Sequence, residues 1–182
     1  MSRDRPLTDA ERKEFFADHG HLAYRYTMLW TQKLRFPDHH GFEHCHAICA
    51  FETSLLACRM FMEFLGLGID RRAGNPVLCE RQEYQKPDDV KVTDLNGAFV
   101  RLSDISQEDS ELLAKVYHMA DKANAHLTHG ASFMEDASIV HAAIPVIDML
   151  LRRNLYDRLG EKPRGHWDRP PTPDVAMATG GP

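Results

Sequence analysis

The sequence has no long uninterrupted hydrophobic run among its 182 residues. Charged residues break the longest apolar stretches well before the ~20 residues that a membrane-spanning helix needs. The first residues, Met-Ser-Arg-Asp-Arg-Pro, also lack the apolar core of a secretory signal peptide. From these absences we expect a soluble cytoplasmic protein that makes no contact with a membrane.

Positive charge is not in excess either. The chain carries 22 Lys and Arg residues against 27 Asp and Glu residues, for a net charge of −5 with histidine neutral. This balance creates no global field that attracts nucleic acid or acidic lipid, so any nucleic-acid contact needs a local basic patch. With 43% hydrophobic residues the chain can bury a core, and its length fits one domain.

Cysteine pairs and cofactor motifs are missing as well. The four cysteines form no C-x-x-C pair, and we expect them to be thiols that act as small hydrophobic side chains. The sequence contains no H-E-x-x-H, P-loop or G-x-G-x-x-G motif. We therefore expect no cofactor and assign no metal ligand.

What the sequence does have is helical periodicity, which is strongest between residues 42 and 67. Apolar residues recur there at steps of three and four and cover most of the helical circumference. We expect this helix at the centre of a bundle, with Gly66 at its C-terminal end. The polar strip that remains consists of Glu52, Arg59 and Glu63.

Three other segments have the apolar period of a helix: residues 9–33, 106–129 and 132–159. Gly20 should divide the first of them, and Pro145 should kink the last. The sequence therefore predicts an all-α fold, an antiparallel helical bundle of four principal helices. The expected inward residues of the third helix are Leu112, Val116, Met119, Ala123 and Leu127, and those of the fourth are Val140, Ile144, Ile147, Leu151 and Leu155.

The bundle domain should span residues 1–160, and the change in composition after it predicts a disordered C-terminal tail over 161–182. A long irregular connection, residues 69–103, joins the second helix to the third. Within it, Asn96-Gly97 stands between two β-prone runs. This pattern predicts either a short β-hairpin or an ordered loop that lies across the bundle.

Candidate functional residues lie near the end of the third predicted helix. His118, Lys122, His126 and His129 follow each other at steps of four, four and three, so a helix would place them in one stripe. Lysine supplies a fixed charge and histidine exchanges a proton near neutral pH, so the stripe could hold a phosphate. The alternative is a solvated face or a cationic helix C-terminus.

The spacing Lys122-Ala-Asn-Ala-His126, followed by Leu-Thr, resembles the Arg-x4–6-His signature of HEPN domains (higher eukaryotes and prokaryotes nucleotide-binding). Residues 54–67 resemble the long second helix of some HEPN proteins, and residues 88–97 resemble the loop that follows it. The resemblance covers residues 10–158. HEPN proteins are all-α and usually dimeric; many are metal-independent ribonucleases, and others bind nucleotides or act as partners of nucleotidyltransferases.

The resemblance implies that His126 is the catalytic histidine and that Lys122 takes the place of the arginine. In an active ribonuclease, His126 would be the general base on the RNA 2′-OH or the general acid on the leaving oxygen, while Lys122 would stabilise the phosphate charge. Lysine cannot make the bidentate grip of arginine. A non-catalytic member fits as well, so the sequence leaves open whether the chain is an enzyme.

The expected binding residues around this catalytic pair are His118 and His129 on the same stripe, together with Arg59 and Glu52 of the central helix. Arg59 and Glu52 either face the same cleft as the pair or form an ion-pair network with Glu63. The expected ligand is RNA or a nucleotide.

Two other interpretations remain open. One is a non-enzymatic bundle that acts by pairing with a second copy of itself or with another protein. The other is a metalloprotein that uses the histidine-rich turn from His39 to His46, which offers five side chains able to bind a metal. The expected partners are therefore a second copy of the chain, a nucleotide or RNA, or another protein.

Overall fold

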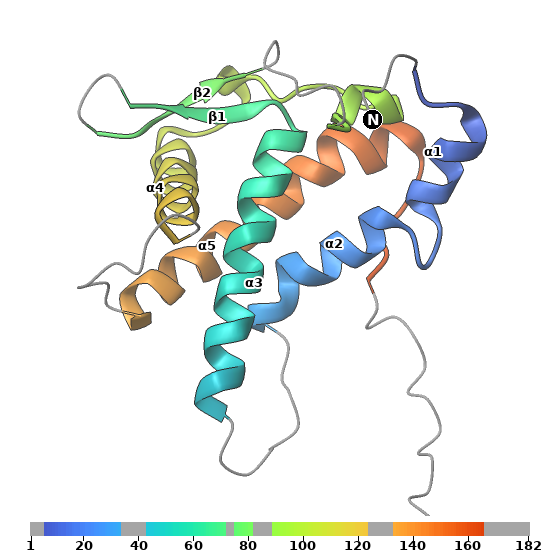
Figure 1. The fold of residues 1–182 in the computed structure, drawn as a ribbon. Coiled ribbons are helices and arrows are strands. Elements are labelled where there is room, and N and C mark those ends of the chain that lie inside the picture. Colours follow the sequence, from blue (N-terminus) through green and yellow to red (C-terminus); the bar gives the residue numbers. More distant parts are fainter. Residues whose placement is uncertain (1–5, 34–42, 72–74, 82–88, 124–132, 166–182) are drawn as a thin grey trace, which may run out of the picture.

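Figure 1 shows helices gathered around one long helix, with a small two-stranded sheet at one of its ends. The regular structure of the described residues is otherwise helical, and this antiparallel pair of strands is the one sheet among them. The predicted all-α bundle is confirmed, including a short hairpin in the connection between the second and third principal helices. This computed structural model describes residues 6–33, 43–71, 75–81, 89–123 and 133–165.

Helix α3 is the element on which the others assemble, because α2, α4 and α5 all pack against it. The sheet contacts α4 and the end of α3. The elements follow the chain in the order α1 (Asp9–Phe16), α2 (His21–Trp30), η1 (Thr31–Lys33), α3 (Glu43–Phe64), β1 (Leu67–Asp70), β2 (Val77–Glu80), η2 (Val92–Leu95), η3 (Leu102–Asp104), α4 (Gln107–Ala123), α5 (Phe133–Leu151), a π-helical turn η4 (Arg152–Tyr156) and α6 (Asp157–Leu159).

The first predicted helix is divided at Gly20, as the sequence indicates. Thr8 starts α1 with a capping box: its hydroxyl accepts from the Glu11 amide at 3.3 Å, and the Glu11 carboxylate accepts from the Thr8 amide at 2.7 Å. At the break, a side-chain carbon on Gly20 would lie 2.2 Å from the carbonyl oxygen of Glu14 and 2.7 Å from that of Phe15. Glycine therefore lets the chain turn sharply between α1 and α2.

The central helix α3 is most deeply buried along its C-terminal half. Leu55, Cys58 and Met62 are at most 1% exposed. Towards its N-terminus the helix projects past α2 and α5 (Figure 1), where Phe51 is half-buried and Leu56 is 38% exposed. The expectation that this helix is buried on most sides therefore holds less well over residues 46–53, where Ala47 and Cys49 are exposed and Ala50 is buried.

The chain leaves α3 through Gly66, which adopts the left-handed conformation with φ of 83°. It then enters the hairpin directly, with Gly68 of β1 opposite Cys79 of β2 in the antiparallel register. The hairpin is thus closer to α3 than the sequence predicts. Its strands are four residues each, and so short a strand leaves little periodic signal.

The segment around Asn96-Gly97 is an ordered loop, which is the other outcome that the sequence predicted there. Turn η2 ends at Asn96 with φ of 64°, and the amide of Gly97 donates to the carbonyl of Val92 at 2.9 Å. Asparagine and glycine are favoured at a left-handed turn end as they are in a tight hairpin. The Asn-Gly dipeptide therefore does mark a tight turn, but this turn ends the 3-10 helix η2 and does not connect two strands.

This loop is tied to the bundle at two points. The amide of Ala98 donates to the carbonyl of Asn154 in η4 at 2.9 Å, and the amide of Val100 donates to the carbonyl of Leu65 at 3.1 Å. Asn154 is itself buried and donates from its side chain to the carbonyl of Leu150 at 2.9 Å. The loop therefore fixes the end of α3 relative to the last helix.

Helix α4 turns a face to the core that is shifted from the predicted one. Leu113, Tyr117 and Ala120 are at most 3% exposed, whereas Leu112 and Met119 are only half-buried. Val116 is fully buried as predicted, but the centre of the buried face lies about one position further along the helix, or about 100° around it. Tyr117 was not among the predicted inward residues, but its ring lies in the core and its hydroxyl donates to Glu63 on α3.

The last principal helix follows its predicted pattern closely. Pro145 lies inside α5 on the exposed side, and beyond η4 and α6 the chain ends its helical course at Gly160, which is left-handed with φ of 68°. The five residues predicted to point inward are fully buried: Val140, Ile144, Ile147, Leu151 and Leu155.

Residues 161–165 of the predicted tail still contact the bundle, since Arg164 forms an ion pair with Asp18 at 2.5 Å. Residues 166–182 lie outside the described residues. In the part of the chain that the structure describes, no helix is both long and apolar enough to cross a membrane.

Candidate functional site

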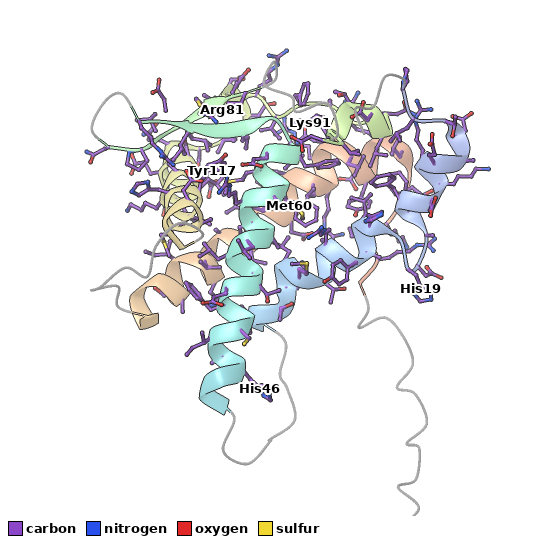
Figure 2. All side chains as sticks on the ribbon, viewed as in Figure 1. His19, His46, Met60, Arg81, Lys91 and Tyr117 are labelled. Atoms are coloured by element: carbon purple, nitrogen blue, oxygen red, sulfur yellow. The ribbon has the colours of Figure 1, made fainter. Side chains whose placement is uncertain are left out.

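Charged side chains gather where α3, α4 and the hairpin meet. Two adjoining cavities of about 770 and 230 Å³ lie there, and Arg59, Arg81 and Tyr117 line both of them. Figure 2 shows Tyr117 on α4 and Arg81 at the hairpin, beside the end of α3. We call this region the charged cleft. Its charged residues, together with its tyrosine, are Arg59, Glu63, Asp70, Arg71, Glu80, Arg81, Asp89, Lys91, Tyr117 and Asp121.

Arg59 links the two helices that form the walls of the charged cleft. Its Nε lies 2.9 Å from the carboxylate of Glu63 on α3, and its Nη1 lies 2.6 Å from the carboxylate of Asp121 on α4. The guanidinium also stands over the ring of Tyr117 at 5.3 Å from the centroid. Partial burial alone would lower the pKa of Arg59, but the hydrogen bonds and charge of Glu63 and Tyr117 raise it above its ordinary value.

Glu63 and Tyr117 form the second link between α3 and α4. The tyrosine hydroxyl donates to the Glu63 carboxylate at 2.6 Å. Burial, followed by this hydrogen bond and the charge of Glu63, raises the pKa of Tyr117 to about 12. Burial would raise the pKa of Glu63, but the donors Tyr117 and Arg59 outweigh it and lower that pKa. At neutral pH the pair is therefore a neutral phenol that donates to an ionised carboxylate.

Asp121 holds a second arginine at the rim of the cleft. One carboxylate oxygen accepts from Arg59, and the other is paired with Arg71, which follows β1. Asp121 has 16% of its side chain exposed, whereas Arg71 has 60% exposed. Arg71 is thus the more accessible guanidinium, and Asp121 orients it towards the cleft.

Arg81 reaches the cleft because Gly68 has no side chain. A carbon on Gly68 would lie 2.3 Å from Cδ and 2.8 Å from Nε of Arg81. The Arg81 side chain therefore runs across β1 at Gly68, and its Nη2 donates to the carbonyl of Ile69 at 3.1 Å. Its positive charge acts on Tyr117, whose pKa it lowers against the larger effects that raise it.

Lys91 is the most buried cation of the cleft, with 6% of the residue exposed. Its Nζ lies 3.4 Å from the carbonyl of Glu63, in the last turn of α3, and 3.8 Å from the carboxylate of Asp89. A cation at this point interacts favourably with the C-terminal end of the helix. Neither distance is that of a short hydrogen bond.

The charges of the cleft nearly cancel: four cations (Arg59, Arg71, Arg81, Lys91) face five carboxylates (Glu63, Asp70, Glu80, Asp89, Asp121). Glu80 accepts from Arg101 at 3.1 Å and from the Leu102 amide at 3.0 Å. Its carboxylate is therefore bound by two residues that do not line the cleft. What distinguishes the cleft is the convergence of guanidinium groups from separate elements. Such groups recognise phosphate or carboxylate.

Of the residues singled out in the sequence, Arg59 lies in the charged cleft. Glu52 lies about two turns before it on α3 and is exposed. His118 is half-buried on α4, one position after Tyr117, and does not line either cavity of the cleft. The structure therefore brings Arg59 together with Glu63, as one interpretation of the polar strip predicted, and leaves Glu52 outside.

The predicted catalytic pair cannot be placed. Lys122 belongs to the last turn of α4, but its side chain is outside the described part of the chain, as are His126 and His129. Most of the turn from His39 to His46 also lies outside it. Within the described ranges, no group of three or more His, Cys, Asp and Glu side chains is arranged to hold a metal ion. The metalloprotein interpretation remains a prediction about undescribed residues.

Sequence reasoning missed Arg71, Arg81, Tyr117 and Lys91. The signals were faint: a glycine inside a short strand, which often marks the close approach of another group, and basic residues that follow each hairpin strand. No protein-family model, curated protein or solved structure matches the chain. What the protein does is therefore inferred from the cleft and the surfaces around it.

Proposed function

We propose that the charged cleft binds a phosphate-bearing ligand, either a nucleotide or a segment of RNA. One observation carries the proposal: Arg59, Arg71 and Arg81 come from α3, the end of β1 and the end of β2, and line one cavity. Guanidinium groups present planar, paired donors that match the oxygens of a phosphate. The nucleotide-binding role that the HEPN resemblance implies agrees with this chemistry.

The ion pairs inside the cleft would prepare it for such a ligand. Glu63 and Asp121 hold Arg59 between them, so this guanidinium is already fixed and loses little freedom on binding. Arg71 is held by Asp121 but is largely exposed, and it would exchange its carboxylate partner for a ligand oxygen. Because the surrounding carboxylates compete with the ligand, we expect modest affinity that falls as salt is added.

Substitution of Arg71 tests this proposal with a matched control. Arg71→Ala should weaken binding of AMP, or of a short single-stranded RNA, about tenfold or more, as expected when a charge-assisted hydrogen bond is lost. Arg153→Ala is the control, since Arg153 of η4 is 57% exposed against 60% for Arg71 and pairs with Asp104 of η3, away from the cleft. Calorimetric titration of both variants gives the affinities. Equal affinities for the two variants would show that the charged cleft is not the site that binds the ligand.

Catalysis by a metal-independent ribonuclease mechanism is the stronger form of the proposal. Asp121 of α4 belongs to the cleft, and Lys122 and His126 follow it in the sequence. Cleavage of RNA should then persist in EDTA and disappear in His126→Ala. If the wild type and this variant show the same background cleavage, the protein binds its ligand without cutting it.

The exposed start of α3 supports a second candidate function, which is association with another copy of the chain or with a protein partner. Ala47 and Cys49 are exposed, Ile48 and Phe51 are half-buried, and Leu56 is 38% exposed. Apolar side chains gathered on a projecting helix are typical of a protein interface. We favour a homodimer, which the HEPN resemblance also implies.

Light scattering tests the dimer. The wild type should have the mass of two chains, and Leu56→Glu should reduce it to one. Met149→Glu is the matched control, because Met149 on α5 is 47% exposed and is also a large apolar residue. A wild-type monomer at high micromolar concentration, or dissociation by both variants alike, would exclude an interface at the start of α3.

A further inference from the structure

A third cavity, of about 430 Å³, adjoins the charged cleft and differs from it in chemistry. It lies between α2, the C-terminal half of α3 and residues 89–91, where Figure 2 shows Met60 and Lys91. Its volume is in the range of small-molecule sites, about 300–1,000 Å³. Its apolar wall consists of Phe15, Leu22, Met60, Phe61, Phe64 and Val90.

The apolar wall is incompletely packed. Phe15, Met60, Phe64 and Val90 are only half-buried, although they contact a core whose central residues are fully buried. Side chains that line an open cavity forgo the dispersion contacts that a packed neighbour would give. An apolar body in this space would supply those contacts and remove the exposed surface from water.

The polar side of the cavity holds one arginine, Arg25, whose charge no described carboxylate neutralises. Arg25 is half-buried and contacts the sulfur of Met28 at 3.7 Å and the ring of Tyr24 at 5.6 Å. Among the described residues it has no carboxylate partner. A half-buried guanidinium without a carboxylate partner favours an acidic ligand over a neutral one.

Lys91 adds to this field, because its nearest carboxylate oxygen, on Asp89, is 3.8 Å away. The other acid at the cavity, Glu63, is already engaged by Arg59 and by Tyr117. Neither carboxylate at the cavity pairs with Arg25, so one acidic group on a ligand would be enough to pair with it.

We propose that this cavity binds a small amphipathic acid, an apolar body that carries one carboxylate or phosphate group. The body packs against Met60 and Phe64, and the acidic group pairs with Arg25 in the field of Lys91. Lys91, Glu63 and Asp89 line both this cavity and the charged cleft, but Arg25 and Met60 line only this cavity, so variants of these two residues test the proposal separately.

The experiment uses 3-phenylpropionate as the acid and 3-phenylpropan-1-ol as its neutral counterpart. The methyl resonance of Met60, assigned in methionine-labelled protein by the Met60→Leu variant, reports binding at this cavity. The acid should shift this resonance and bind about tenfold more tightly than the alcohol, as the gain of one charge-assisted hydrogen bond predicts. Phenyl phosphate in place of the carboxylate shows which acidic group the site prefers, and either preference supports the proposal.

Arg25→Gln should lower the affinity for 3-phenylpropionate about tenfold, to that of the alcohol, and leave the alcohol unaffected. Arg153→Gln is the control and should change neither. Because glutamine at a half-buried site preserves most of the side-chain volume, this variant should fold, and circular dichroism verifies it. The proposal is overturned if millimolar acid leaves the Met60 resonance unmoved, or if Arg25→Gln binds acid and alcohol as the wild type does.

Discussion

Gly68 and Arg81 occupy one space: the place where a side chain of β1 would begin is filled by the stem of the arginine, 2.3 Å from the ideal Cβ position. The absence of a side chain on one strand therefore sets the position of a cation that follows the other. A substitution at Gly68 can therefore displace Arg81 without removing its charge, and the effect of position can be tested apart from the effect of charge.

Gly68→Ala should move Arg81 out of the charged cleft without removing its charge. The atoms in the way belong to a flexible side chain, so the fold should persist and the melting temperature should change little. Affinity for a nucleotide should fall as far as it does in Arg81→Ala. Calorimetric titration compares the two variants, and an alanine variant that binds as the wild type does would show that Arg81 has no part in binding.

Gly20→Ala should behave in the opposite way. The added carbon would meet the carbonyl oxygens of Glu14 and Phe15 at 2.2 and 2.7 Å, and backbone atoms cannot swing aside as an arginine can. We expect the free energy of unfolding to fall by about 1–3 kcal/mol, as for other overpacked sites. Urea unfolding measures this, and an unchanged midpoint would mean that the break between α1 and α2 relaxes easily.

The sequence alone predicts that Phe51→Asp and Leu55→Asp both prevent folding, but the structure separates them. Leu55 is 1% exposed, so an unpaired charge there costs several kcal/mol. Phe51 is half-buried on the projecting part of α3, where a carboxylate keeps contact with water. We expect insoluble protein from Leu55→Asp and soluble, cooperatively melting protein from Phe51→Asp.

Stability should also change at both ends of the pH scale through Glu63 and Tyr117. The pKa of Glu63 is lowered by folding, so its contribution is present above its ordinary pKa of 4.5 and is lost as the pH falls through the lower folded value. The pKa of Tyr117 is raised to about 12, so its contribution is complete below 10.0 and is lost as the pH rises through about 12.

Urea unfolding across the pH range measures both effects. Tyr117→Phe should reduce the alkaline loss of stability, and Tyr26, whose pKa burial and Asp148 raise to about 12, should account for part of what remains. Glu63→Gln should reduce the loss in acid. An alkaline profile that Tyr117→Phe leaves unchanged would mean that the phenol is not held by Glu63 in solution.

The sequence predicted buried residues best where the pattern of a single helix determines which side chains face the core. The inward residues of α5, such as Ile144 and Leu151, are all buried as expected, because an apolar period on one helix reports directly on its packing. On α4 the prediction was right for Val116 but missed Tyr117, which combines a buried ring with a polar hydroxyl. A pattern that classes every residue as either apolar or polar misassigns a residue that is both.

The charged cleft could be predicted only in part. Arg59 and Glu63 are four residues apart on one helix, so their pairing follows from helical geometry. Arg71, Arg81 and Asp121 come from separate segments, and only the packing of the hairpin on α4 brings them together. A pattern within one segment of the sequence cannot predict that residues of separate segments lie together.

The bonds of Ala98 and Val100 to Asn154 and Leu65 have a consequence for how the irregular connection opens. Loops of this kind usually exchange their amide hydrogens quickly and accept inserted residues. Here the stretch cannot loosen unless the last helix and the end of α3 part as well. Its amides should therefore exchange as slowly as those of the surrounding helices, and an insertion after Ala98 should cost as much as a break in the core.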